Sequence, residues 1–212
     1  MGAGGKPAEM IPRNLIRIMP AEETIFPSDR QGGIFMSARK LAYCAICIAL
    51  AFILSLIRIF TFPFGGDITL CSLLFVVLPA WLFGVPSGVI CGLLYGMLVF
   101  FISPYYVSFT QFLFDYVLAF SVMGLAGLFR NADNGLVKGY ALAVFLRWVM
   151  ATIAGIIWVS LGMTAWDGWH PLPYSMAYNA AYIFSEALAT VILLMIPAVR
   201  KPLERVKSIA NR

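Results

Sequence analysis

The feature that most constrains this chain is the scarcity of charge between Leu41 and Val199. Over the whole sequence, 61% of residues are hydrophobic and 12% are charged, whereas a soluble domain carries about 25% charged residues. A helix that crosses the hydrocarbon core of a bilayer needs about 20 mainly apolar residues. The stretch therefore predicts an all-α integral membrane protein, built as a bundle of six transmembrane helices.

Apolar runs separated by turn-forming residues set the expected helix boundaries. The six ranges are 40–60, 70–83, 86–103, 109–129, 138–161 and 178–198, of which the second is short. We therefore expect a polar, disordered N-terminal extension at 1–39, a six-helix membrane domain at 40–199 and a basic cytoplasmic tail at 200–212. Because Met36-Ser-Ala-Arg-Lys40 resembles a natural start, we expect residues 1–35 to be dispensable.

The positive charges at the expected helix ends fall on one side of the membrane. They are Arg39, Lys40, Arg130, Lys138, Arg200, Lys201, Arg205 and Lys207. The positive-inside rule makes this side cytoplasmic, so we expect a multi-pass protein of the cell membrane with both termini inside. The same rule explains the net charge of +5 without a nucleic-acid partner. Loops 1, 3 and 5 then face outward and present an acidic, aromatic surface.

Two expected helices carry small residues four positions apart, a spacing that stacks them on one helical face. The third helix has Gly88, Gly92 and Gly96, and the first has Ala45 and Ala49. Such a face either packs tightly inside the bundle or receives a second membrane protein. We favour internal packing for the glycines, and docking is more plausible for the alanines.

The sequence lacks the residue sets that catalysis, metal binding or ATP hydrolysis requires. Cys44 and Cys47 form a C-x-x-C, but no second pair or nearby histidine completes a zinc site. No P-loop motif is present, and no catalytic set can be assembled around His170, the single histidine. We therefore expect no metal, no cofactor and no enzymatic activity. A self-sufficient secondary transporter would show paired halves or broken helices, and the sequence shows no internal repeat.

Asp115 is the most informative charge within an expected span, where a charge costs about 2.5–3.5 kcal/mol. Gln111 precedes it by four residues and shares its helical face. This face presents an amide and a carboxylate to the outer vestibule, within reach of the aromatic residues of loops 3 and 5. A carboxylate ringed by Tyr and Trp suits a flat organic cation. The structural alternative is an ion pair with Arg147, and Glu186 either pairs with Arg147 or closes the pocket floor.

Loop 5 and the start of the last helix add Trp166, Trp169, Tyr174 and Asn179. The two tryptophans fit either a binding pocket or an interfacial aromatic belt. Tyr174 and Asn179 lie about a turn and a half apart on a helix, where together they can offer a ring and an amide to a heterocycle.

These segments resemble a known family, the thiamine-specific S components, which are the substrate-binding subunits of energy-coupling-factor (ECF) transporters. The resemblance runs from about Ala45 to beyond Asn179 and rests on motifs that follow one another in order. They are Ala45-x-x-x-Ala49, Ala51-Phe-Ile-Leu-Ser-Leu-Ile57, Gly92-Leu-Leu-Tyr-Gly96, Gln111-Phe-Leu-Phe-Asp-Tyr116, Gly124-Leu-Ala-Gly-Leu-Phe-Arg130, Ala154-Gly-Ile-Ile157, Ala165-Trp-Asp-Gly-Trp169 and Tyr174-Ser-Met-Ala-Tyr-Asn179.

The resemblance implies that the chain binds thiamine from the outside with high affinity and passes it inward. ATP would be hydrolysed by a separate energy-coupling module of two ATPases and a transmembrane scaffold subunit, which docks on the face formed by Ala45 and Ala49. The alternatives are an S component for another small vitamin or heterocycle, or a self-sufficient secondary transporter.

The resemblance also implies the lining of the pocket. Asp115 matches the acidic residue that contacts thiamine, which is often Glu in the family. The other matching residues are Tyr105, Gln111, Tyr116, Tyr174 and Asn179. Two departures concern the fifth helix, where Ala151 replaces a histidine and Val159 stands in the place of a stacking tryptophan. Trp158 and Trp166 are therefore the candidate stacking partners for the pyrimidine ring.

Overall fold

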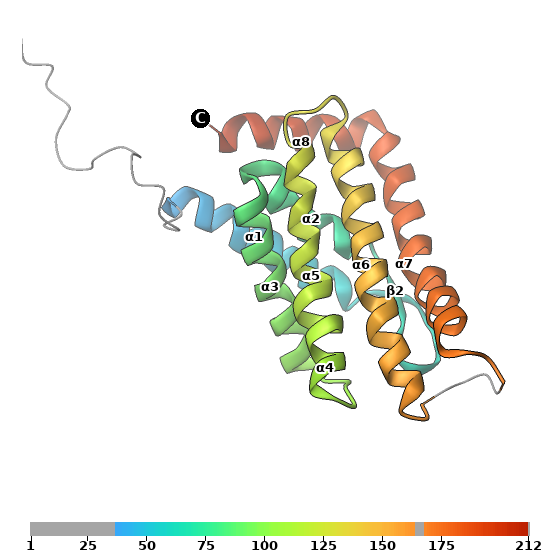
Figure 1. Ribbon diagram of the computed structural model, residues 1–212. Coiled ribbons are helices and arrows are strands. Elements are labelled where there is room, and N and C mark those ends of the chain that lie inside the picture. Colours follow the sequence, from blue (N-terminus) through green and yellow to red (C-terminus); the bar gives the residue numbers. More distant parts are fainter. Residues whose placement is uncertain (1–36, 164–167, 212) are drawn as a thin grey trace, which may run out of the picture. The chain divides into compact units, whose positions relative to one another are not determined.

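The computed structural model describes residues 37–163 and 168–211, which form a helical bundle (Figure 1). The five helical segments long and apolar enough to cross a membrane are α1 (Ala38–Ser55), α3 (Val85–Ile102), the run Phe109–Phe129, α6 (Gly135–Ser160) and α7 (Pro171–Met195). The sixth is the shorter apolar helix α2 (Ser72–Phe83). The expected all-α membrane fold is thus confirmed. α1 begins at Ala38, within the extension expected at 1–39, and residues 1–36 of that extension lie outside the described residues.

α2 lies within the bundle and is buried on nearly every side. Its 12 residues rise about 18 Å, less than the roughly 30 Å of a hydrocarbon core. Leu74, Val77 and Leu82 are among its buried side chains, and a helix that is hydrophobic all round belongs in the centre of a protein. α2 therefore acts as a core element that the surrounding helices cover.

The segment between α1 and α2 is an antiparallel hairpin. Strand β1 (Arg58–Thr61) pairs with strand β2 (Asp67–Thr69), and the short turn η2 (Pro63–Gly65) joins them. The expectation that the first helix continues to residue 60 was wrong, because α1 ends at Ser55. Two glycines follow Phe64, which itself has a positive φ of 68°, and this turn lets the chain fold back.

The run Phe109–Phe129 is one helical segment with changes of pitch. It consists of α4 (Phe109–Phe112), the π-helix η3 (Leu113–Leu118), α5 (Ala119–Ser121) and the 3-10 helix η4 (Val122–Phe129). π-Helical turns are rare and often mark functional sites. Here the π-helix contains Asp115, the charge singled out from the sequence.

The three glycines of α3 make a close backbone crossing with this segment. A Cβ added at Gly88 would lie 2.8 Å from the Gly124 Cα, and one at Gly92 would lie 2.9 Å from the Phe120 carbonyl carbon. Gly96 meets the backbone of Tyr116 in the same way. The prediction of internal packing is confirmed for these glycines.

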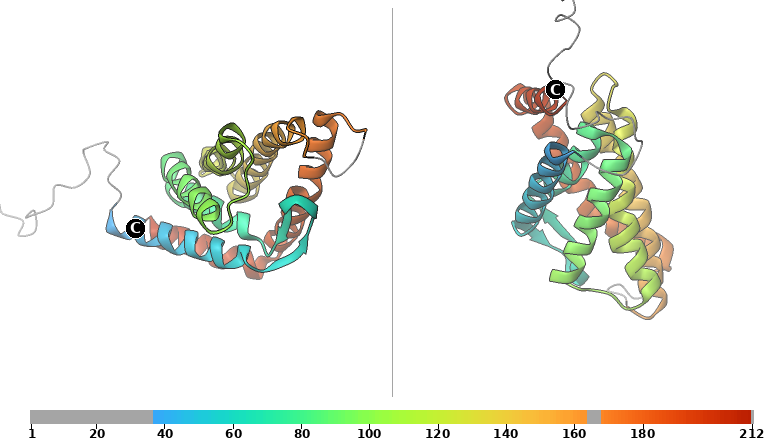
Figure 2. Two further views of the ribbon diagram at one scale, coloured as in Figure 1. Left: turned by 90° about the horizontal axis from the view of Figure 1, so that it is seen from below. Right: turned by 90° about the vertical axis from the view of Figure 1, so that its left-hand side faces the viewer.

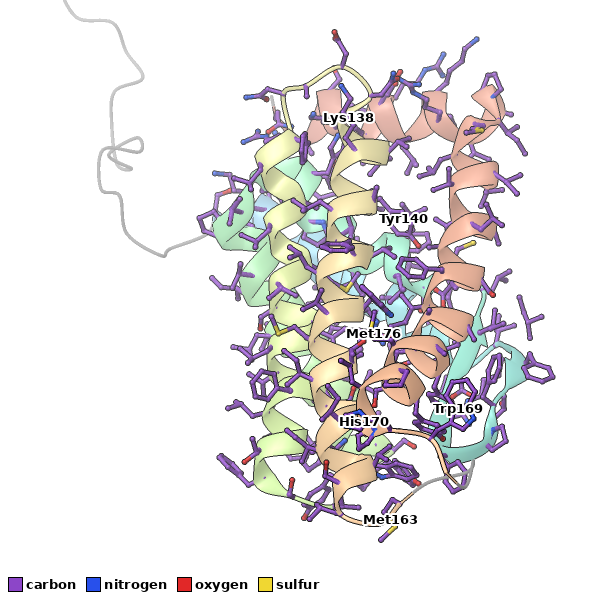
Figure 3. The ribbon with its side chains drawn as sticks, turned by 45° about the vertical axis from the view of Figure 1, so that its right-hand side comes forward. Lys138, Tyr140, Met163, Trp169, His170 and Met176 are labelled. Atoms are coloured by element: carbon purple, nitrogen blue, oxygen red, sulfur yellow. The ribbon has the colours of Figure 1, made fainter. Side chains whose placement is uncertain are left out.

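The two ends of the bundle differ in chemistry. Figure 3 shows Lys138 at the end that carries α8 (Pro197–Ala210), and Trp169 and His170 at the other end. α7 begins at Pro171 and not at 178, because a proline fits the first turn of a helix. The basic tail expected at 200–212 is helical as far as Ala210, and it crosses the end of the bundle (Figures 1 and 2).

Candidate functional site

A cavity opens at the end of the bundle away from α8, between the hairpin, the π-helix, α6 and α7. Its narrow part measures about 100 Å³. An adjoining part of about 270 Å³ reaches toward the N-terminal end of α2. Both parts are lined by Tyr105, Asp115, Tyr116 and Tyr182, so they form one continuous site with a carboxylate at the junction.

The structure brings together seven of the eight residues that the sequence assigns to ligand binding. The narrow part is lined by Tyr105, Gln111, Asp115, Tyr116, Trp158, Tyr174 and Asn179. They come from α4, the π-helix, α6, α7 and the loop before α4, so the fold gathers positions far apart in the sequence. Trp166, the eighth, lies outside the described residues. The role of each residue in binding stays a prediction.

Asp115 is oriented by its neighbour on the same helical face. Gln111 Nε2 donates to Asp115 Oδ2 at 3.1 Å, while Gln111 Oε1 accepts from the Val107 backbone N–H at 3.1 Å. The amide is therefore held at both ends, and it fixes one oxygen of the carboxylate. Arg147 is not within ion-pair distance of Asp115 in the described chain. Its guanidinium carbon lies 4.0 Å from the centre of the Phe120 ring.

Aromatic rings form the walls of the narrow part. The Trp158 ring lies 5.0 Å from Phe64 and 6.3 Å from Tyr105, measured between ring centroids. Tyr174 and Tyr178 are stacked at 5.9 Å with an interplanar angle of 9°. Such rings attract a flat cation through their faces, by about 2 kcal/mol where water is excluded. The pocket thus combines a carboxylate with several π surfaces.

Some polar groups that line the pocket near α7 form hydrogen bonds within the chain, and others have no hydrogen-bond partner among the described atoms. Asn179 Nδ2 donates to the carbonyl oxygens of Ala151 and Ser175, and Asn179 Oδ1 accepts from Tyr182. The Ser175 hydroxyl is buried and has no hydrogen-bond partner among the described atoms, and the same holds for Trp158 Nε1. A buried polar group without a partner costs about 1–3 kcal/mol, so both groups can gain from a bound heterocycle.

The hairpin covers this cavity. The Tyr178 hydroxyl accepts from the Gly66 backbone N–H at 3.1 Å and donates to the Pro63 carbonyl oxygen. Only a glycine fits at position 66 without a shift of its neighbours, because an added Cβ would lie 2.8 Å from a ring carbon of Tyr182. The turn of the hairpin is therefore fitted against α7, and Phe64 lies over Trp158.

Glu186 closes the floor of the larger part and is 4% exposed. Its carboxylate accepts from the Thr69 hydroxyl at 2.7 Å, from the Thr69 N–H and Ser72 hydroxyl at 3.2 Å, and from the Leu73 N–H at 3.2 Å. These donors surround the N-terminus of α2, whose partial positive charge favours a carboxylate. Of the two roles left open for Glu186, the structure shows the floor and not a pair with Arg147.

Replacing Glu186 with Ala should lower the free energy of unfolding in detergent by about 3 kcal/mol, because several buried donors then lose their acceptor. The measurement is the shift of the unfolding midpoint. Glu204→Ala is the matched control, since this exposed carboxylate of α8 should contribute less than about 1 kcal/mol. Equal shifts in the two variants would contradict the role given to Glu186.

Several lining residues were not predicted as ligand contacts. The narrow part of the cavity is also lined by Phe64, Ser175, Tyr178 and Tyr182. One signal was present in the sequence, because Tyr174, Tyr178 and Tyr182 recur every four residues and share a face of α7. No comparable pattern marks Phe64, whose place depends on the hairpin.

Comparisons with known proteins agree on one family. The family described as thiamine transporter protein matches residues 41–205. The thiamine transporter ThiT of Bacillus subtilis strain 168 is 30% identical over 172 residues, which cover 73% of this chain and 88% of that protein. The solved structure of ThiT from Listeria monocytogenes has a TM-score of 0.63 and 22% identity, covering 77% of this chain and 96% of that one. At this identity the structural likeness concerns the fold.

Proposed function

The chain belongs to the thiamine transporter protein family, and from this premise we propose that it captures thiamine in the cavity beneath the hairpin. The observation that carries the proposal is that residues chosen from the sequence for a flat organic cation line one cavity. Thiamine has a cationic thiazolium ring and a neutral aminopyrimidine ring. The pocket offers a distinct chemistry to each of them.

Asp115 lies where it can neutralise the thiazolium, and Tyr105 and Tyr116 line the cavity beside it. The aminopyrimidine has ring nitrogens that accept and an amine that donates hydrogen bonds. Trp158 Nε1 and the Ser175 hydroxyl, both buried and unpaired in the described chain, suit such a ring. The indole of Trp158 also offers a stacking surface. Among the residues that the structure describes, Trp158 is therefore the candidate stacking partner for the pyrimidine ring.

We also propose the direction of binding and the source of energy. The basic end that carries α8 faces the cytoplasm by the positive-inside rule, so the cavity takes its ligand from outside. Ala45 and Ala49 are exposed on α1, which lies at the edge of the bundle (Figure 2). The chain has no P-loop. We infer that α1 docks with an ECF module of two ATPases and a scaffold subunit, so that the chain serves as an S component.

Titration of the purified protein with thiamine should give a saturable quench of tryptophan fluorescence at micromolar ligand or below, because a stacked ring alters the emission of Trp158. Trp158→Phe should remove most of the quench. Equilibrium dialysis with labelled thiamine separates a lost signal from lost binding. A protein that binds no thiamine in dialysis would sink the thiamine assignment, and a panel of other small heterocycles would then identify the alternative ligand.

A further inference from the structure

A second cavity lies at the opposite end of the bundle from the thiamine pocket. It measures about 560 Å³ and is bounded by α8, the turn between η4 and α6, and the end of α2. Arg130, Arg200 and Lys207 line it, together with the carboxylates of Asp133 and Glu204. Both carboxylates are exposed, and Glu204 already pairs with Arg200 at 2.7 Å. Arg130 and Lys207 are therefore the cations left to face the cavity.

Arg130 and Lys207 are held close together, and neither forms an ion pair in the described part of the chain. Lys207 Nζ donates to the Arg130 carbonyl oxygen and lies 4.5 Å from the centre of the Trp81 ring. Arg130 Nη2 donates to Asn211 Oδ1 at 2.6 Å, whereas its Nε is buried and lacks a partner among the described atoms. Burial and the charge of Arg130 lower the pKa of Lys207. Neither cation thus has a carboxylate at ion-pair distance in the described chain, although Glu204 lies near enough to favour the charged form of Lys207.

The start of α6 adds to this positive field. Gly135, Leu136 and Val137, the first residues of this 26-residue helix, line the cavity. The preceding Asn134 has a φ of 55°, its side chain caps no backbone N–H, and the first turn holds no acidic residue. A helix N-terminus carries a partial positive charge, and here no side chain of its own first turn offsets it.

α8 also carries uncovered apolar residues outside the lining of the cavity. Val199 and Leu203 pack against the core, but Val206 and Ile209 are exposed. α8 crosses the end of the bundle in Figure 1, where a membrane protein meets the headgroup region. A basic helix that lies there with exposed apolar residues is typical of an interfacial helix.

We propose that this cavity binds the phosphodiester headgroup of an anionic phospholipid, with Arg130 and Lys207 as its cationic contacts. Val206 and Ile209, exposed on α8, hold this helix in the lipid interface, so the cavity meets lipid headgroups before soluble phosphates. A zwitterionic phospholipid brings its own cation and competes poorly for such a site. Clusters of Lys and Arg at the cytoplasmic edge of spans attract anionic lipids by the same physics.

The test is native mass spectrometry of the full chain, purified in detergent with equimolar phosphatidylglycerol and phosphatidylcholine of identical acyl chains. Wild type should retain at least about fivefold more phosphatidylglycerol, the factor expected for one charge near a lipid surface. Ser208→Glu places a carboxylate at the rim of the cavity without removing any contact of Arg130 or Lys207. This variant should lose most of the preference, and Ser208→Gln should keep it.

Two further arms separate the outcomes. Arg130→Gln with Lys207→Gln should abolish the preference, while Lys201→Gln, on the exposed side of α8, should preserve it. sn-Glycerol 3-phosphate at millimolar concentration should not displace the lipid; complete displacement would show a site for soluble phosphates and overturn the lipid assignment. Equal retention of both lipids by wild type would also overturn it. Thiamine binding should be unchanged in Ser208→Glu, so this test is independent of the proposed function.

Discussion

Replacing Asp115 with Asn should weaken thiamine binding by about two to four orders of magnitude. The substitution keeps the shape of the side chain and removes its charge, so the thiazolium enters a largely dehydrated cavity without a counter-ion. Removing one partner of a buried ion pair costs about 3–5 kcal/mol, which corresponds to this loss of affinity. The dissociation constant can be measured by calorimetry or by the fluorescence titration.

The control for Asp115→Asn is a neutral pyrimidine fragment of thiamine, whose binding should fall by less than about fivefold, because a hydrogen bond and not a full charge is altered. Asp133→Asn, at the opposite end of the bundle, should change neither affinity. If thiamine and the neutral fragment lose equal affinity, the Asp115 carboxylate maintains the shape of the pocket and does not pair with the thiazolium.

Replacing Ala45 with Trp should reduce cellular thiamine uptake at least about tenfold and leave thiamine binding by the purified protein intact. The side chain of Ala45 is exposed on α1, so a bulky residue there can be accommodated in the isolated chain. It would instead obstruct the close approach of a partner helix, since small residues on such a face let backbones come together. Uptake of labelled thiamine in cells and dialysis of the purified variant measure the two effects.

Leu188→Trp is the matched control for Ala45→Trp, because Leu188 is also an exposed apolar residue but belongs to α7 and not to α1. It should leave both binding and uptake unchanged. Loss of binding in Ala45→Trp would mean that α1 is packed within the bundle. Unchanged uptake would remove the alanine face from the proposed interface with the ECF module.

The spans could be predicted from the sequence because a membrane imposes a simple rule on charge and length. α3 and the run Phe109–Phe129 agree with expectation within one residue. The ends of the helices were harder to predict, because the same residue type can end one helix or begin another. The last span was expected to start at 178, yet α7 begins at Pro171, which fits an N-terminal turn. No helix was predicted for the tail at 200–212, yet α8 continues through Pro202. The hairpin was not predicted, because β1 continues the apolar run of α1.

The site was predictable where it follows the periodicity of one helix or a match to a family motif. Gln111 and Asp115 do share a face and form the hydrogen bond that their spacing allows. Contacts between elements were not predictable in this way. Phe64 reaches Trp158 only because the hairpin folds over the cavity, and Glu186 meets the N-terminus of α2 only because α2 starts within the bundle. Such encounters depend on tertiary packing, which no local pattern records.

The glycine crossing between α3 and the run Phe109–Phe129 has a mechanical consequence for the pocket. Backbones in direct contact at Gly88, Gly92 and Gly96 have no side chains between them that could change rotamer and absorb a displacement. The two helices must therefore move as one body, and Asp115 and Tyr116 move with them. The wall that carries the carboxylate is a fixed template. Adaptation to an arriving ligand falls to the hairpin and the Pro171 end of α7, whose mutual contacts are side-chain rings and single hydrogen bonds.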